Sequence, residues 1–398
     1  MNTKKTVAHA VSASRRGRVV GVISGVAAAT TLALAIAGAL VTVQVALTVV
    51  KPVRRRVRPE RILDDDPQEH TVTLKETDES VMPGRLGLWF DHDRGYAQLG
   101  DIVRHENGRV TRRVHELRGT SPLRGRAWIT GNYYVHPEEL GIPYQDVHVP
   151  TDLGPTPAWL FPATDQKTDT WMIGVHGWRS SRQELLRAVP LFHEAGYNAL
   201  LMTYRNDVDA PASSDRRYGL GGTEWRDIDA AITFAQQAGA RSIVLMGWSM
   251  GGAIVLQTVT RTSHPELIAG IVLESPVIDW VDTLRFQAGL LHLPDVVFRG
   301  ALGLLTSSRA RPVTGLAEGI NFGALDFVAR SGDLTVPTLL MHSDDDVFVP
   351  SGPSRALATS RDDIVTFVPF TQAMHTQLWN NDEHKWSRAI TSWLTRLT

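Results

Sequence analysis

The strongest constraint on this chain is a short glycine-flanked segment, Gly-Trp-Ser-Met-Gly-Gly, at residues 247–252. It separates an apolar run, Ser242–Met246, from a run that favours a helix, Ala253–Thr260. This order predicts a strand, a sharp turn and a helix, with Ser249 at the tip of a strained turn and its hydroxyl directed outwards. The glycines are needed because a side chain at either position would collide with the strand or the helix. Ser249 is therefore a candidate nucleophile, provided that a base and an oxyanion site lie nearby.

Apolar runs and helix-favouring runs alternate on both sides of this turn. The expected strands are Tyr144–Val149, Ala158–Phe161, Trp171–Val175, Ala199–Thr203, Ser242–Met246, Ile268–Leu273, Thr338–Met341 and Ile364–Val368. The expected helices include Arg182–Ala195, Glu224–Ala238 and Trp379–Leu397. Such alternation predicts the α/β class, with a doubly wound, mostly parallel sheet. Ligands of such sheets bind beyond the carboxyl ends of the strands, which is where the Ser249 turn is expected.

An apolar segment at about residues 276–332 interrupts the alternation between two of the expected strands. Its pattern predicts helices at Leu284–Leu291 and Val296–Leu305. We expect a helical cap insertion that covers the mouth of the site, either as a packed cover or as a lid that lines an acyl pocket.

The region before the α/β domain has a different pattern. Short alternating runs and an Asn107-Gly108 hairpin signal predict a small antiparallel β unit at residues 70–143, followed by the α/β domain at 144–398. The arginines and histidines of the β unit are interpreted as a solvated face. Asp207, Asp209 and Asp215, in a later loop, are likewise interpreted as loop-solvating residues.

The N-terminal residues predict a membrane anchor. A basic tail at residues 1–18 precedes residues 19–50, which contain no charged residue and are long enough to span a bilayer. A cleaved signal peptide is the alternative, but its apolar core is normally only about 7–15 residues. Residues 51–69 are charged and interpreted as a linker.

Basic residues flank the predicted transmembrane helix on both sides, so the positive-inside rule hardly distinguishes the two orientations of the helix. A first helix with a short basic tail usually keeps that tail in the cytoplasm. This favours an extracytoplasmic catalytic domain.

Composition excludes several function classes. The net charge of -1 gives no indication of a nucleic-acid-binding surface. The absence of cysteine excludes disulfides, thiolate metal sites and a cysteine nucleophile.

Three adjacent aspartates, Asp344, Asp345 and Asp346, follow one of the expected strands. Aspartates in turns are usually turn formers, so at most one is expected to be a catalytic acid. Asp346 is preferred because its spacing before Val-Pro matches a recognisable pattern, while Asp345 and then Asp279 are the alternatives.

The candidate base must follow the acid and reach the Ser249 turn. His375 lies between the last expected strand and the final helix, whereas His384 is expected on the surface of that helix. The order Ser249, Asp346, His375 gives nucleophile, acid and base.

The candidate oxyanion donors are two backbone N–H groups. His176-Gly177-Trp178 follows the strand Trp171–Val175, and its tight turn can direct the N–H of Trp178 at a tetrahedral oxyanion. The second donor is the N–H of Met250, and His176 is interpreted as structural. Trp248 and Arg205 are candidate substrate contacts, Arg205 because its loop follows a strand at the ligand-binding edge.

Together these motifs resemble the α/β-hydrolases of the serine class, most closely the dienelactone-hydrolase-like or prolyl-oligopeptidase-like branch. The resemblance covers about residues 144–398 and rests on His176–Trp178, the 247–252 turn, His342–Pro350 and Met374-His375. One departure is His342-Ser343, where these proteins usually have histidine-glycine. The resemblance implies acyl transfer through Ser249, His375 and Asp346, with no metal or organic cofactor.

Three functions remain open at this point. The first is an ester hydrolase, for which membrane tethering and the apolar insertion favour small-molecule or lipid-like esters. The second is a serine peptidase or acyltransferase with the same machinery. The third is a catalytically silent, membrane-anchored binding module.

Overall fold

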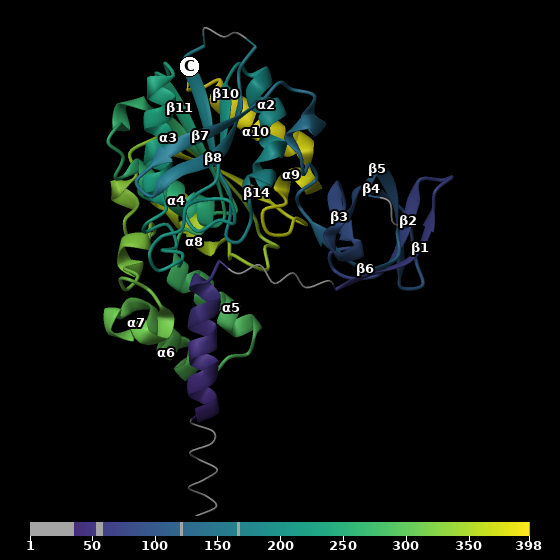
Figure 1. Ribbon diagram of the computed structural model, residues 1–398, viewed down its shortest axis with the longest axis horizontal. Helices are drawn as coiled ribbons and strands as arrows, with labels where there is room; N and C mark the ends of the chain where they lie inside the picture. Colours follow the sequence, from purple (N-terminus) through teal and green to yellow (C-terminus); the bar gives the residue numbers. More distant parts are fainter. Residues whose placement is uncertain (1–35, 53–58, 120–121, 165–167, 398) are drawn as a thin grey trace, which may run out of the picture.

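The computed structural model describes residues 36–52, 59–119, 122–164 and 168–397. These residues form an N-terminal helix, a small β-barrel and a larger α/β domain, and the barrel lies beside the α/β domain (Figure 1). The N-terminal helix emerges next to the helices of the cap.

The small β unit is a closed barrel. Its strands are ordered β1-β2-β5-β4-β3-β6. They are β1 (Glu60–Asp66), β2 (Thr71–Lys75), β3 (Leu86–Phe90), β4 (Gly95–Glu106), β5 (Arg109–Arg118) and β6 (Gly125–Thr130). The predicted hairpin is present, since Glu106 pairs with Arg109 across Asn107 and Gly108, which both have positive φ. The strand β4 that leads into this hairpin is 12 residues long.

Two predictions for this region are wrong. The linker predicted at 51–69 includes the strand β1. Its sequence contains several acidic residues and lacks the regular alternation of apolar and polar side chains that indicates a strand. Arg112 is not part of a solvated face, because it points into the barrel and is fully buried. Its guanidinium donates to the backbone carbonyls of Gly100, Ser80, Met82 and Gly84, so its donors are satisfied without a carboxylate. Burial lowers the pKa of Arg112 to about 10.

The α/β domain is built on an eight-stranded sheet ordered β14-β13-β12-β11-β9-β10-β8-β7. Its strands are β7 (Gln145–Thr151), β8 (Gly154–Phe161), β9 (Thr170–Val175), β10 (Asn198–Met202), β11 (Ser242–Trp248), β12 (Ile268–Glu274), β13 (Thr338–Ser343) and β14 (Val365–Phe370). Every pair from β10 to β14 is parallel, whereas β7 and β8 form an antiparallel edge. The predicted α/β fold with a mostly parallel sheet is confirmed.

Helices cover both faces of this sheet. Alternate residues of β11 enter different hydrophobic cores: Ile243 and Leu245 enter one, and Val244 and Met246 enter the other. The helices are α2 (Val189–Glu194), α3 (Trp225–Gln237), α4 (Met250–Val259), α8 (Gly352–Ser360), α9 (Leu378–Asn381) and α10 (Glu383–Leu394). The helix predicted at Arg182–Ala195 is a 3-10 helix over Arg182–Ala188 that continues as α2.

The cap follows β12 and returns to β13, as predicted. Its main helices are α5 (Trp280–Leu290), α6 (Asp295–Thr306) and α7 (Arg311–Thr314). Asp279 begins α5, because its carboxylate accepts the N–H groups of Val281 and Asp282 and caps the helix.

The barrel docks on α9. Asn380 donates to the carbonyls of Arg85 and Gly131, and its own carbonyl accepts the N–H of Arg85. Gly84 has φ +89, and a Cβ there would lie 1.8 Å from the Asn380 oxygen, so this approach of two backbones requires glycine.

Residues 36–50 form a helix whose C-terminal part packs on the α/β domain. Ala46 and Val50 are fully buried, and the N–H of Tyr218 donates to the Val50 carbonyl at 2.9 Å. This part of the segment predicted to span the membrane (19–50) therefore contacts protein. Residues 19–35, and the basic tail at 1–18, lie outside the described residues. In the part of the chain that the structure describes, none of the helices has both the length and the apolar character of a membrane span.

Candidate active site

Ser249 occupies a strained turn between β11 and α4. Its φ of 52° and ψ of -117° lie in a region that side chains rarely adopt. A Cβ on Gly251 would lie 2.1 Å from the Val175 carbonyl oxygen, and one on Gly247 would lie 2.5 Å from the Gly251 oxygen. These close approaches explain why the turn needs glycine at both positions.

The structure brings together the predicted nucleophile, base and acid. The Ser249 hydroxyl donates to Nε2 of His375 at 2.8 Å, and Nδ1 of His375 lies 2.7 Å from Oδ2 of Asp346. Ser249 and Asp346 are buried, and the His375 side chain is 18% exposed. A hydroxyl, an imidazole and a carboxylate in this order can move the serine proton to the imidazole.

The environment of Asp346 keeps its carboxyl group ionised. Oδ1 accepts the N–H groups of Phe348 and Val349, and Nε2 of His342 lies 3.3 Å from Oδ2. Burial raises the pKa of Asp346, but the charge and hydrogen bonds of His375 and His342 outweigh it. The net result is a pKa well below the usual value.

The alternative acids have other roles. Asp345 accepts the N–H of Gln372 at 2.7 Å, and Asp344 pairs with Arg355. Asp279 caps α5. None of these carboxylates has a hydrogen bond to His375 among the described contacts, so the geometry favours Asp346.

The turn after β9 lies directly against Ser249. A Cβ on Gly177 would be 3.2 Å from the Ser249 Cβ, and the Gly177 N–H donates to the buried Glu184 carboxylate at 2.8 Å. This hydrogen bond fixes the turn that carries the backbone N–H of Trp178, one of the two predicted oxyanion donors. The other donor, the N–H of Met250, is at the N-terminus of α4, where a helix stabilises negative charge.

His176 is structural, as the sequence indicated. Its ring stacks on Tyr204 with centroids 4.3 Å apart, and Nε2 lies 2.8 Å from Oδ2 of Asp207. Burial lowers the pKa of His176, but Asp207 outweighs burial and the net pKa is raised. Asp207 is therefore a buried partner of His176, and its interpretation as a loop-solvating residue is wrong.

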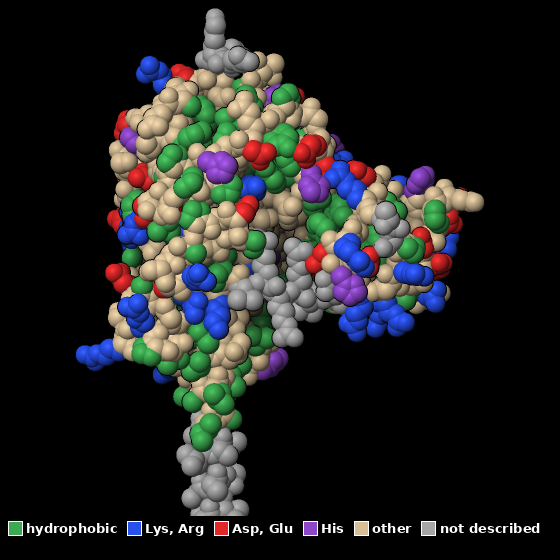
Figure 2. All heavy atoms as spheres, in the orientation of Figure 1, with side chains coloured by type: hydrophobic (Ala, Val, Ile, Leu, Met, Phe, Trp, Pro, Cys, Tyr) green, Lys and Arg blue, Asp and Glu red, His purple; other side chains and the backbone are tan. Residues whose placement is uncertain are grey.

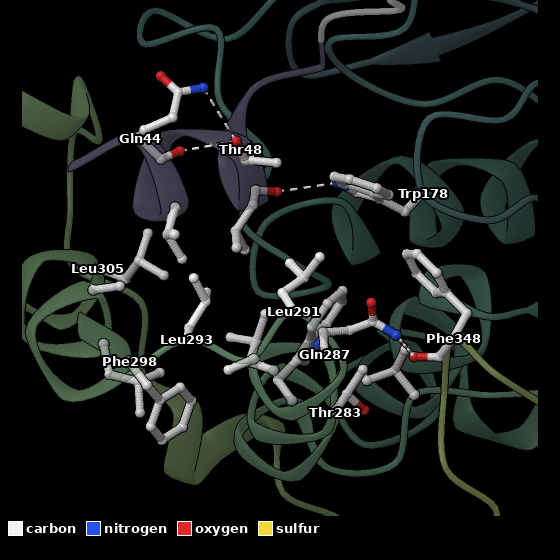
Figure 3. Close-up of a pocket in the computed structure, with 18 of the residues that line it drawn as sticks. Gln44, Thr48, Trp178, Thr283, Gln287, Leu291, Leu293, Phe298, Leu305 and Phe348 are labelled. Carbon is white, nitrogen blue, oxygen red and sulfur yellow. Dashed lines mark hydrogen bonds between the residues drawn. The ribbon is translucent and has the colours of Figure 1, made fainter. Parts of the chain in front are cut away.

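A pocket of about 260 Å³ opens next to Ser249. Its lining is largely apolar and comes from the cap, from Trp178 and Phe348, and from the N-terminal helix (Figure 3). Gln287 of α5 donates to the Phe348 carbonyl at 2.7 Å, which connects the cap to the loop that carries Asp346. The cap therefore lines a pocket at the serine, whereas its action as a lid over an acyl chain stays a prediction.

The two predicted substrate contacts do not line this pocket. Trp248 is fully buried in the sheet core, with Arg187 over its ring. Arg205 forms a bidentate pair with Asp227 at 2.9 Å and also contacts Asp152 at 2.6 Å. These contacts occupy the guanidinium and make Arg205 a structural residue.

Sequence reasoning missed Glu184 and the N-terminal helix as parts of the site. Neither has a local signal, because Glu184 lies in an ordinary helix-like run and the helix had been interpreted only as an anchor. Over the described ranges, no group of three or more His, Asp and Glu side chains is arranged to hold a metal ion.

Comparisons with known proteins agree with this fold. Residues 172–388 match the model of the Alpha/beta hydrolase family, and residues 61–130 match a family described as a domain of unknown function (DUF8805). The family match covers more than half of the chain, which therefore belongs to the alpha/beta hydrolase family. The DUF8805 match corresponds to the barrel. No curated protein matches the sequence.

Solved structures of esterases share the fold. An esterase from Pyrococcus furiosus has a TM-score of 0.51 at 18% identity, covering 66% of this chain and 94% of that chain. A second crystal form of that esterase has a TM-score of 0.50 at 19% identity, covering 66% and 93%. An esterase from Rhodococcus sp. has a TM-score of 0.44 at 15% identity, covering 64% and 99%. At these identities the likeness concerns the fold alone.

The contacts of Asp346 predict how the reactivity of Ser249 depends on it. Asp346→Asn is expected to slow labelling of Ser249 by a short-chain fluorophosphonate about 10⁴-fold, because the imidazole loses the carboxylate that orients it. The lowered pKa keeps this carboxylate ionised from pH 6 to 8, so the loss should be similar throughout that range. The measurement is the labelling rate of the full chain in detergent.

Asp345→Asn is the matched control. It changes the adjacent carboxylate, which contacts only the Gln372 backbone in the described structure, and should label at the wild-type rate. An equal loss in both variants, or no loss in Asp346→Asn, would contradict the assignment.

Proposed function

We propose that this protein is a membrane-anchored serine hydrolase that cleaves carboxylic esters through an acyl-enzyme intermediate. The observation that carries the proposal is the hydrogen bond of 2.8 Å from Ser249 to His375 beside an apolar pocket. The family membership and the esterase-like fold support the same reaction class.

In the proposed first step, Nε2 of His375 accepts the hydroxyl proton as Ser249 Oγ attacks the ester carbonyl carbon. The carbonyl oxygen becomes an oxyanion that accepts hydrogen bonds from the N–H groups of Trp178 and Met250. Each such donor is worth roughly 3–4 kcal/mol of transition-state stabilisation. Asp346 holds the Nδ1–H tautomer and stabilises the imidazolium.

Collapse of the tetrahedral intermediate breaks the bond to the alcohol oxygen, which leaves with the proton from Nε2. Water then repeats the sequence on the acyl-enzyme: His375 accepts its proton, the hydroxide oxygen attacks, and the carboxylic acid departs as Ser249 regains its proton. All the groups that move protons in this scheme belong to the chain and the substrate.

Membrane attachment is part of the proposal. The uncharged sequence that precedes the packed end of the N-terminal helix, about residues 19–41, is long enough for a span of roughly 20 residues. The short basic tail before it favours an extracytoplasmic catalytic domain. Assignment to the dienelactone-hydrolase-like or prolyl-oligopeptidase-like branch also stays a prediction.

Replacement of Ser249 tests the reaction most simply. Ser249→Ala is expected to lower kcat for p-nitrophenyl butyrate about 10⁶-fold, because the hydroxyl that would carry the acyl group is removed. Ser263→Ala, which alters an exposed serine, is the control and should retain full activity. Near-normal turnover by Ser249→Ala would remove Ser249 as the nucleophile.

The same preparation separates the rival functions. An ester hydrolase should turn over esters much faster than peptide anilides and should release free acid when an alcohol acceptor is added. Preferential amide cleavage would identify a peptidase, and acyl transfer to the alcohol would identify an acyltransferase. Absence of both labelling and turnover in the wild-type chain would favour a silent binding module.

A further inference from the structure

The N-terminal helix forms one wall of the pocket at Ser249. Val45 and Val49 line the pocket from this helix, and Phe298 and Leu305 line it from α6. Figure 3 shows the helix residues Gln44 and Thr48 across the pocket from the labelled cap residues. The cavity beside the serine is therefore bounded by a segment more than 190 residues away from it in the chain.

The end of this helix is held by specific donors of the α/β domain. The last carbonyls of a helix have no partner within it and must be satisfied by other groups. Here the Trp178 indole donates to the Val49 carbonyl at 3.0 Å, and Arg179 donates to the Thr48 carbonyl at 2.7 Å. The Tyr218 N–H donates to the Val50 carbonyl at 2.9 Å.

These donors connect the helix to the catalytic turn. Trp178 carries the predicted oxyanion donor on its backbone, while its side chain caps the helix. A helix that served only as a tether would need no such contacts. The helix is instead held by the side chain of Trp178, the residue that carries one of the predicted oxyanion donors.

Exposed apolar side chains lie on the cap and the N-terminal helix, two of the elements that line the pocket. Leu291, at the end of α5, lines the pocket and is 67% exposed, and Val296 of α6 is 75% exposed. Leu40 of the N-terminal helix is 65% exposed. Figure 2 shows hydrophobic side chains gathered around this end of the cap and helix.

The helix and α6 approach each other closely below the pocket. A Cβ on Gly300 would lie 2.9 Å from Thr42 Cγ2, so glycine lets the Thr42 side chain pack directly against α6. The chain before residue 36 is uncharged back to residue 19. An apolar edge that continues into such a sequence is suited to a lipid bilayer, whose hydrocarbon covers apolar side chains at no cost in hydration.

We propose that Val45 and Val49 form a wall of an acyl-chain site, and that the acyl chain of a bilayer lipid ester enters this site between the N-terminal helix and the cap. The proposal rests on the proposed ester hydrolase function and names its substrate class. The helix then acts both as the anchor and as a determinant of chain-length specificity.

A larger side chain on the N-terminal helix tests whether this helix forms a wall of the acyl-chain site. Val45→Trp is expected to lower kcat/KM for p-nitrophenyl decanoate at least about tenfold, because one or more methylenes lose their place in the pocket. Turnover of p-nitrophenyl acetate, whose acyl group is eight methylenes shorter, should fall less, so the ratio of decanoate to acetate turnover should fall. Val41→Trp introduces the same side chain on the same helix at a position that does not line the pocket, and should keep the wild-type profile.

The outcomes separate this inference from the function on which it rests. An unchanged ratio of decanoate to acetate turnover in Val45→Trp, with Ser249 still labelled, would contradict the proposal that the helix forms a wall of the acyl-chain site. The proposed hydrolase function would not be affected by that result. Loss of labelling and of all ester turnover in the wild-type chain would instead overturn the proposed function.

A second variant tests whether the ester substrate enters the pocket from the bilayer. Val296→Asp places a charge on the apolar edge and outside the pocket lining, because Val296 is exposed and does not line it. With the full chain in phosphatidylcholine vesicles, it should slow hydrolysis of a vesicle-embedded palmitoyl ester at least about tenfold and leave acetate turnover unchanged, since a charge is disfavoured in the hydrocarbon of a bilayer.

Val208→Asp is the matched control, since Val208 is 77% exposed on a loop of the α/β domain. Equal rates for Val296→Asp and Val208→Asp on the embedded ester would show that the substrate arrives from solution and would overturn entry from the bilayer.

Discussion

The close packing of the Ser249 turn against the end of β9 is the constraint on which the rest of the site depends. Gly251 lies so near the carbonyls of Val175 and His176 that no side chain could be accommodated. Ser249 donates its backbone N–H to Glu274 at the end of β12, and its carbonyl accepts the N–H of Val277, where the cap begins. Three strand ends and the first residues of the cap are therefore fixed relative to one hydroxyl.

The barrel contacts the segment of the chain that carries His375. Met374, the residue before His375, packs against the barrel core, and the α9 residue Asn380 is hydrogen-bonded to the barrel backbone. The loop that carries the imidazole is thus held between two domains.

Local patterns were enough to predict the sheet and the candidate triad. The strands of the α/β domain are continuous apolar runs, and the Ser249 turn has a glycine requirement that few other structures impose. Residues whose roles depend on distant partners could not be predicted in this way. Arg205 pairs with Asp227 of α3, Arg112 binds carbonyls on other segments of the barrel, and Val45 lines a pocket with residues of α6 only in the folded chain.

We expect Ser249 to carry the acyl group of an ester within the pocket formed by the cap and the N-terminal helix. The most direct measurement is mass spectrometry of peptides from the full chain, quenched in acid within milliseconds of mixing with p-nitrophenyl laurate. We expect a lauroyl group on the peptide that contains Ser249. Rapid release of p-nitrophenol with the acyl group on another residue, or on none, would contradict it.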